Sequence, residues 1–303
     1  MTNTADRSTQ IRAKLDAYRK NADGYQDLQR LMIRYAIERF LHRLSKSSHK
    51  ERFVLKGAML LELYLTTRTR TTANVDFLAF GEFSAEAMKR VVRDICSIKL
   101  DDGIKFKQNS ITVTANNGDR DNPGFKVAIA SNLGEAPIPL SLDICFGEVV
   151  YPPSPLVSYP SLLDLPHPHI RVYPPETIVA EKFQTVVARG MGNNRLKDYY
   201  DLWALSVERE FYGVDLQKAI AGTFERRKTA IPGAVPVGLT ETFYGSKRKK
   251  TDWQAFLKKH GLSKSTSLEV VSVSIANFAM PLCDALLAED EFDKKWVNVR
   301  GWS

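Results

Sequence analysis

Residues 70–80 read RTTANVDFLAF, and this stretch decides what kind of sheet the chain builds. Its apolar pattern predicts a strand over residues 75–80. Side chains two apart in a strand point to the same face, so Asn74 and Asp76 project together while the apolar residues between them face the other side. The two residues are therefore either a metal-binding pair with one charge missing or the polar edge of an ordinary sheet.

A second strand with one polar face is predicted over PLSLDICFG, residues 139–147. Its leucine, isoleucine and phenylalanine side chains alternate with Ser141, Asp143 and Cys145. Asp143 is thus an ionised group in the middle of an apolar strand. A charge in that position is costly unless it meets a partner, a metal ion or water in a cleft.

If the two strands are neighbours, Asn74, Asp76 and Asp143 converge on one spot. Three oxygen donors suit Mg²⁺, or Mn²⁺, bound together with a nucleoside triphosphate (NTP). Such an ion keeps water and phosphate ligands and takes only one or two protein carboxylates. The alternative is a pair of strand-end aspartates bonded to a turn or to lysines, and spacing alone leaves both interpretations open.

The turn KGAMLLELYL adds a candidate phosphate contact. Gly57 lies between a predicted strand and a predicted helix, so backbone can approach a ligand closely there, and the N–H groups at a helix start favour phosphate. Lys56 is a second candidate nucleotide contact. Strand-glycine-helix junctions are common in proteins with sheets and helices, and Lys56 also fits a surface lysine.

Two consecutive helices are predicted for ETIVAEKFQTVVARG and RLKDYYDLW. The first carries Lys182, and the second carries Asp198 and Asp201. The spacing of these aspartates from Arg195 and Lys197 allows ordinary surface ion pairs. The second helix is otherwise apolar, however, so its charges also fit a buried junction. A structural clamp and a role in an active site both remain open.

Composition indicates a soluble globular protein with a polyanionic partner. The 303 residues are 44% hydrophobic and 26% charged, and no apolar run that we identify is long enough to predict a membrane span. The net charge of +8 favours a partner rich in phosphate. No secretory signal is recognisable, so we expect a cytoplasmic protein with no membrane contact. The three cysteines predict neither a disulfide framework nor a zinc site.

The order of predicted elements indicates an α+β protein in three parts. Residues 1–50 are expected to form N-terminal helices that pack on the core. Short strands mixed with helices predict a domain with a mixed sheet over residues 51–172, and a proline-rich segment marks its end. Residues 173–303 are expected to form a helical domain.

Taken together, four segments resemble a known family. FVLKGAMLLELYL, RTTANVDFLAFG, LSLDICFGEVVYP, and ETIVAEKFQTVVARG with RLKDYYDL are similar, in this order, to the AbiEii-type nucleotidyltransferase toxins, to which the MenT toxins are related. The resemblance runs from about residue 25 to about residue 206. It implies a nucleotidyltransferase-like mixed sheet that presents metal-binding acidic residues, backed by a helical domain, and a toxin–antitoxin (abortive infection) system with a cognate antitoxin.

The resemblance also implies roles for single residues. In the family's first motif, Ser or Thr is followed by two alternating aspartates, and Thr72, Asn74 and Asp76 occupy these places. The third acidic position falls on Asp143. The family's later motifs imply that Lys182 contacts nucleotide phosphates and that Asp198 lies near the reacting groups. The supporting members are Glu181, Lys197 and Asp201. Some family members transfer nucleotides to the acceptor end of tRNA.

Asn74 departs from this motif because its amide is neutral where the family has a metal-binding aspartate. Three functions therefore stay in view. The first is a Mg²⁺-dependent transferase that moves a nucleotide from NTP to RNA, with the acceptor end of tRNA as the expected target. The second is a catalytically impaired protein that binds nucleotide or RNA. The third is a basic scaffold for another protein, suggested by the run SKRKK at 246–250, which otherwise fits a solvated loop.

Overall fold

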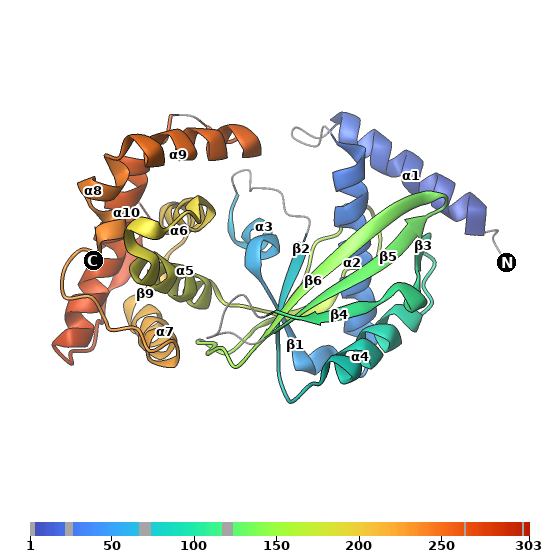
Figure 1. Cartoon of the computed structure of the whole chain (residues 1–303), viewed down its shortest axis with the longest axis horizontal. Coiled ribbons are helices and arrows are strands. Elements are labelled where there is room, and N and C mark those ends of the chain that lie inside the picture. Colours follow the sequence, from blue (N-terminus) through green and yellow to red (C-terminus); the bar gives the residue numbers. More distant parts are fainter. Residues whose placement is uncertain (1–3, 22–26, 67–73, 117–123, 264, 299) are drawn as a thin grey trace. The chain divides into compact units, whose positions relative to one another are not determined.

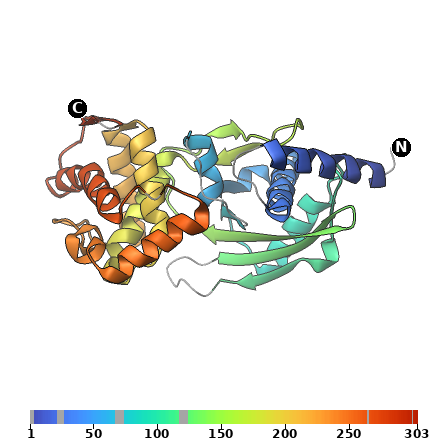
Figure 2. The same ribbon diagram turned by 90° about the horizontal axis from the view of Figure 1, so that it is seen from above.

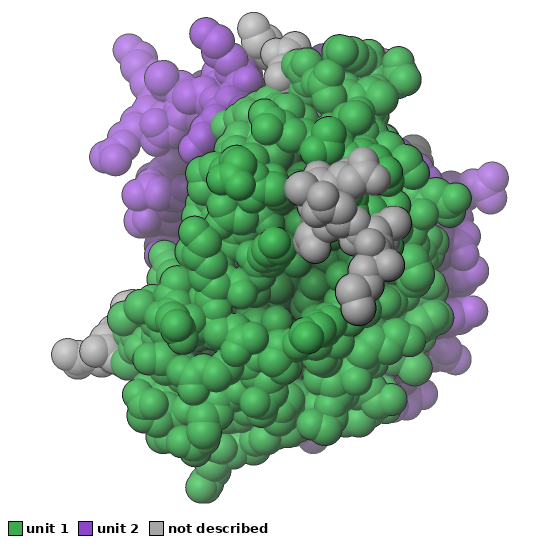
Figure 3. All heavy atoms as spheres, turned by 90° about the vertical axis from the view of Figure 1, so that its right-hand side faces the viewer, with its two compact units in different colours: residues 1–59, 72–147, 155–172 green, residues 60–71, 148–154, 173–303 purple. Residues whose placement is uncertain are grey.

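The computed structural model describes residues 4–21, 27–66, 74–116, 124–263, 265–298 and 300–303. The chain divides into two compact units, which Figure 3 distinguishes by colour. Unit 1 consists of residues 1–59, 72–147 and 155–172, and unit 2 consists of residues 60–71, 148–154 and 173–303.

Unit 1 contains one mixed sheet and three α-helices among its described residues, and the long β5–β6 hairpin is its most extended feature (Figures 1 and 2). The strands are β1 (Phe53–Lys56), β2 (Asn74–Ala79), β3 (Ile104–Phe106), β4 (Thr112–Ala115), β5 (Gly124–Leu133), β6 (Ala136–Phe146), β7 (Leu156–Ser158) and β8 (His169–Val172). The helices are α1 (Thr4–Asn21), α2 (Leu28–Lys46) and α4 (Ala85–Ser97).

The sheet has the order β3-β5-β6-β2-β1-β8-β7, and β4 pairs with β5. Its centre is mixed, because β2 runs parallel to β6 and antiparallel to β1. Helix α2 packs on β6 and β8, and the ring centroid of its Phe40 lies 6.4 Å from that of Phe77 on β2. One face of the central strands is therefore apolar and covered by α2, and the polar side chains of the same strands point to the other face.

Unit 2 is mainly helical in its described residues. Its helices are α3 (Leu61–Tyr64), α5 (Pro175–Arg189), α6 (Leu196–Glu208), α7 (Gly213–Arg226), α8 (Glu241–Tyr244), α9 (Lys247–His260) and α10 (Leu268–Leu287). A small sheet contains β9 (Phe211–Tyr212), β10 (Lys295–Val297) and β11 (Gly301–Trp302). All four tryptophans of the chain lie in this unit.

Helix α10 is the one helix among the described residues that is long and apolar enough to cross a membrane by length and composition. Core helices of soluble proteins pass the same test, and α10 packs on α6 and α7, with Phe278 and Leu282 fully buried. The helix therefore gives only weak support to a membrane span.

The structure confirms the expected α+β class, with a mixed sheet, N-terminal helices and a helical C-terminal part. Two local predictions were wrong. The helix expected after Gly57 is a 3₁₀ turn (Gly57–Leu60) followed by the short α3. The basic run 246–250 is no loop, since α9 begins at Lys247. The proline-rich segment also supplies the strands β7 and β8, because its residues between prolines can still pair with each other and with β1.

Candidate active site

The two aspartates expected to share a metal ion lie side by side in unit 1. In the parallel pairing of β2 with β6, Asp76 is directly opposite Asp143, and Asn74 is opposite Ser141. Residues opposite each other in a ladder share a face, so both carboxylates point away from α2. Asn74, Asp76 and Asp143 are each partly exposed. The structure thus brings together the three residues that the sequence singled out.

Two lysines extend this pair into a line of four charges. Lys56 on β1 is the ladder partner of Asp76, and Lys126 on β5 is the ladder partner of Asp143. We call Lys56, Asp76, Asp143 and Lys126 the charged row. Sequence reasoning missed Lys126, although the alternation in FKVAIASN separates it from the buried Val127. Only the pairing of β5 with β6 shows that it flanks an aspartate.

The side chain of Asn74 is bonded to the row. Its Nδ2 donates a hydrogen bond of 3.3 Å to Oδ2 of Asp143. An aspartate at this position would instead bring a third negative charge beside Asp143, and repulsion between like charges is relieved by a bound cation. No group of three His, Cys, Asp or Glu side chains suited to a metal ion occurs among the described residues. The neutral amide therefore leaves a site with two carboxylates.

Gly57 approaches the same carboxylate from the end of β1. Its φ of +79° is in the left-handed region, and a Cβ atom added there would overlap Oδ2 of Asp76 and lie 2.7 Å from its Cγ. The close backbone approach expected at this glycine is thus an approach to Asp76 in the structure. A side chain at position 57 would displace the carboxylate.

Cys145 lies on the polar face next to the charged row. Its Sγ is 3.5 Å from Nζ of Lys56, and the residue is partly exposed. The other two cysteines are buried, and burial raises the pKa of the Cys96 thiol and of the Cys283 thiol to about 12. The three thiols therefore differ in environment, and the one beside the charged row is the most accessible.

The remaining predicted site residues form an ion-pair cluster in unit 2. Nζ of Lys182 on α5 lies 2.8 Å from Oδ1 of Asp198 and 2.8 Å from Oδ2 of Asp201, both on α6. Nε of Arg195 is 2.6 Å from Oδ2 of Asp198. The side chains of the two aspartates are at most 1% exposed. These contacts join α5 to α6, so the structural clamp that the sequence allowed is present; a role in catalysis stays a prediction.

Electrostatics in this cluster keep Asp198 ionised. Burial alone would raise the pKa of its carboxyl, but the charges of Lys182 and Arg195 outweigh burial, and the pKa is lowered below its ordinary value. Of the supporting residues, Glu181 lies 3.5 Å from Arg227, and Lys197 lines a surface pocket near the start of α6. Thr72 falls outside the described residues.

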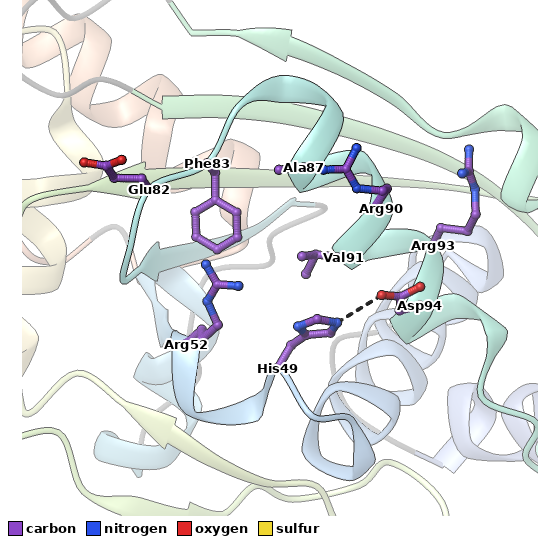
Figure 4. A pocket seen from close by; sticks show the side chains of 9 residues that line it. All are labelled: His49, Arg52, Glu82, Phe83, Ala87, Arg90, Val91, Arg93 and Asp94. Carbon is purple, nitrogen blue, oxygen red and sulfur yellow. Dashed lines mark hydrogen bonds and ion pairs between the residues drawn. The ribbon is translucent and has the colours of Figure 1, made fainter.

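A separate pocket of about 460 Å³ in unit 1 contains none of the predicted site residues (Figure 4). It lies between the start of β1 and α4, where the Arg52 guanidinium is 4.0 Å from the centroid of the Phe83 ring. His49 bonds to Asp94 at 3.2 Å across one side of the pocket. Exposed Arg90 and Arg93 also line it. The pocket is therefore basic, but it lacks the paired carboxylates of the charged row.

Comparison with known proteins identifies a related family. The sequence profile described as "Nucleotidyl transferase AbiEii toxin, Type IV TA system" matches residues 39–288. Among solved structures, JHP933 from Helicobacter pylori is 16% identical, with a TM-score of 0.46 and coverage of 86% of this chain and 94% of that chain. A second H. pylori protein, described as a candidate nucleotidyltransferase, is 16% identical, with a TM-score of 0.44 and coverage of 87% and 99%. No curated protein sequence matches.

The close approach of Gly57 to Asp76 predicts that substitution by alanine destabilises the protein more at position 57 than at position 81. Gly57→Ala should lower the free energy of unfolding by about 1–3 kcal/mol for the strained backbone and by more for the overlap with Asp76. Gly81→Ala is the matched control, because Gly81 also has a positive φ (+95°) but its nearest neighbour is the flexible end of Arg52. Urea unfolding followed by circular dichroism measures both variants. Equal losses would contradict the proposed crowding at Gly57.

The lowered pKa of Asp198 predicts a pH-dependent contribution to the stability of unit 2. A carboxyl whose pKa is lower in the folded than in the unfolded state, where it is about 3.9, stabilises fully above that pH and loses its contribution as the pH falls further. Asp198→Asn should therefore cost about 3–5 kcal/mol at pH 7, because it weakens a buried ion-pair cluster, and progressively less below pH 4.

Tryptophan fluorescence during urea unfolding reports on this effect, because all four tryptophans lie in unit 2. The control is Asp252→Asn, which removes a half-exposed carboxylate 3.7 Å from an exposed Arg248 and should cost at most about 1 kcal/mol. A difference between wild type and Asp198→Asn that stays constant from pH 7 to pH 3 would refute the assignment.

Proposed function

The chain belongs to the AbiEii nucleotidyltransferase toxin family, and from this membership we propose that it transfers a nucleotide from an NTP to the 3′ end of RNA, with the acceptor end of tRNA as the target. The observation that carries the proposal is the charged row, in which two adjacent carboxylates are flanked by two lysines on one face of a sheet. In a metal–triphosphate complex, the carboxylates can attract the metal ion and the lysines can attract the phosphates.

The donors at the centre of the row fit a magnesium or manganese ion. Asp76 and Asp143 would supply the carboxylates, and the amide oxygen of Asn74 is a neutral third donor of the same hard type. One or two carboxylates suffice when the triphosphate and water fill the remaining positions. A divalent ion held by these residues would supply charge neutralisation for the triphosphate and the pyrophosphate.

Residues around the acidic pair would also position the triphosphate. Lys56 and Lys126 stand at the two ends of the row, where their ammonium groups attract phosphate oxygens. Gly57 keeps the end of β1 free of a side chain, so that Asp76 holds its place beside Asp143. The RNA 3′-hydroxyl then attacks the α-phosphorus and gives up its proton to solvent, the new phosphodiester bond forms, and the bond to pyrophosphate breaks.

Residues of unit 2 enter this proposal through the family resemblance. Lys182 is proposed to contact nucleotide phosphates and Asp198 to act near the reacting groups, with Glu181, Lys197 and Asp201 in support. The contacts of Lys182 within unit 2 support a positioning role, because the buried carboxylates of Asp198 and Asp201 fix its ammonium group. A cognate antitoxin follows from the type of system to which the family belongs. We also propose that the protein acts in the cytoplasm without a membrane.

A second candidate function is favoured by the hydrogen bond from Asn74 to Asp143. That bond occupies one carboxylate oxygen of Asp143. In addition, Asn74 is neutral where the family motif has an aspartate, so the site attracts a divalent ion less strongly. A protein with this change can keep nucleotide or RNA binding while losing turnover. Nucleotide or RNA binding without nucleotide transfer by the unsubstituted chain would establish this second candidate over the transferase.

The transferase proposal predicts that Asp143→Asn abolishes nucleotide transfer. With α-labelled NTPs, Mg²⁺ and total tRNA, the chain should label RNA, and the variant should fall by at least about a hundredfold, since it removes a charge from the reacting centre. Asp101→Asn, a change of the same kind at an exposed carboxylate of unit 1, should retain activity. No labelling by either the chain or Asn74→Asp would reject the proposal.

The neutral amide predicts a gain of function on restoring the acidic motif. Asn74→Asp should raise transfer by about tenfold or more and tighten divalent-ion binding, because a third carboxylate joins the two in the row. Isothermal titration with Mn²⁺ and the labelling assay measure the two effects separately. Growth arrest of cells that express each form gives a third comparison. Lower transfer by Asn74→Asp would show that the amide is part of the working site.

A further inference from the structure

Helix α9 in unit 2 contains most of the excess positive charge of the chain. Its 14 residues, KRKKTDWQAFLKKH, contain six Lys or Arg and one Asp, a formal charge of +5 compared with +8 for the whole chain. So dense a concentration on one helix makes an electrostatic footprint for a polyanion.

The packing of α9 separates one structural lysine from the others. Lys249 is buried and donates to the backbone oxygen of Asn193 at 2.6 Å and to Oδ1 of Asn194 at 3.0 Å. The side chains of Trp253 and Leu257 are buried on the same side of the helix as Lys249. The other cations are exposed: Lys247, Arg248, Lys250, Lys258 and Lys259. Lys249 thus anchors the helix, and the others face solvent.

A pocket of about 590 Å³ lies between the second half of α9 and the start of α6. Lys259, Arg195 and Lys197 give its wall positive charge, and Asp252 contributes one negative charge. The half-buried ring of Phe256 also lines the pocket; its centroid is 5.4 Å from that of Trp253 and 4.9 Å from that of His260. Cations around a supported aromatic ring are the combination used to bind single-stranded nucleic acid, since phosphates meet the cations and a base stacks on the ring.

We propose that the exposed cations of α9 and the pocket at Phe256 bind single-stranded RNA, with phosphates on Lys250, Lys258 and Lys259 and one unstacked base against Phe256. This inference rests on the proposed function in taking RNA as the partner, and it assigns the contact to a surface that does not include the charged row. The combination of ring and cations favours RNA over an acidic protein, for which charge alone would suffice.

The test measures binding of the full chain to a fluorescein-labelled single-stranded RNA by anisotropy, over a series of salt concentrations. Lys250→Glu/Lys259→Glu should weaken binding by about tenfold or more and flatten the slope of log K against log salt by about 1.4, because each phosphate contact on a single strand contributes about 0.7. Arg90→Glu/Arg93→Glu is the matched control. It makes the same charge change on two exposed cations of unit 1 and should weaken binding less than about threefold.

Phe256→Leu tests the stacking contact while keeping an apolar side chain under the pocket. It should weaken RNA binding at least about fivefold with little change in the salt slope, since stacking on an aromatic ring contributes about 1–3 kcal/mol per base. Tryptophan fluorescence during unfolding checks that unit 2 remains folded in each variant. A Phe256→Leu variant that binds like the wild type would overturn the base-binding part of the proposal.

Three outcomes would overturn the proposal as a whole. Equal weakening by the two double variants would show general attraction to net charge, and no RNA binding by the chain would remove the partner. Displacement of the RNA by poly-glutamate as readily as by poly-uridine would indicate an acidic protein instead. Measuring RNA binding without NTP or divalent ion separates this inference from the proposed function, because binding is then expected whether or not the chain transfers nucleotides.

Discussion

The parallel pairing of β2 with β6 is the constraint on which the candidate site depends. It places Asp76 opposite Asp143, and the side chains alternate strictly along both strands. A slip of one residue in this register would turn one aspartate toward α2, where Phe77 and Phe40 pack. Because burying a charge among these rings is strongly unfavourable, the apolar core fixes the register and, with it, the acidic pair. The site is thus held in place by the residues on the opposite face.

Much of this arrangement could be predicted from the sequence because the signals were local. Alternation identified the two strands and the polar side of each, and family resemblance assigned Asp76 and Asp143 to the acidic positions of a nucleotidyltransferase-like sheet. Lys126 was missed because nothing in FKVAIASN shows that this strand pairs with β6; that relation depends on tertiary structure. Asn74 was correctly placed beside Asp143, but its donated hydrogen bond depends on the side-chain position in three dimensions.

Residues of one type serve different purposes in unit 2, and only their surroundings distinguish them. Lys182 on α5 donates a hydrogen bond to Asp198 on α6, and Lys249 on α9 donates one to the backbone oxygen of Asn193. Each lysine thus joins two segments of unit 2 that are apart in the sequence. The exposed lysines of α9 face solvent, although two of them, Lys247 and Lys250, stand in one unbroken basic run with Lys249. The run resembled a solvated loop because charge composition does not reveal that a helix begins within it, with one lysine turned inward and the rest outward.

The position of Cys145 has a practical consequence for chemical modification of this protein. Two of the three thiols are buried and have a raised pKa, so they stay protonated and react slowly with electrophiles. Cys145 is partly exposed, and its Sγ lies 3.5 Å from Nζ of Lys56. Alkylating reagents should therefore modify this single thiol first and introduce a spectroscopic label or a blocking group beside Asp143, without any engineered cysteine.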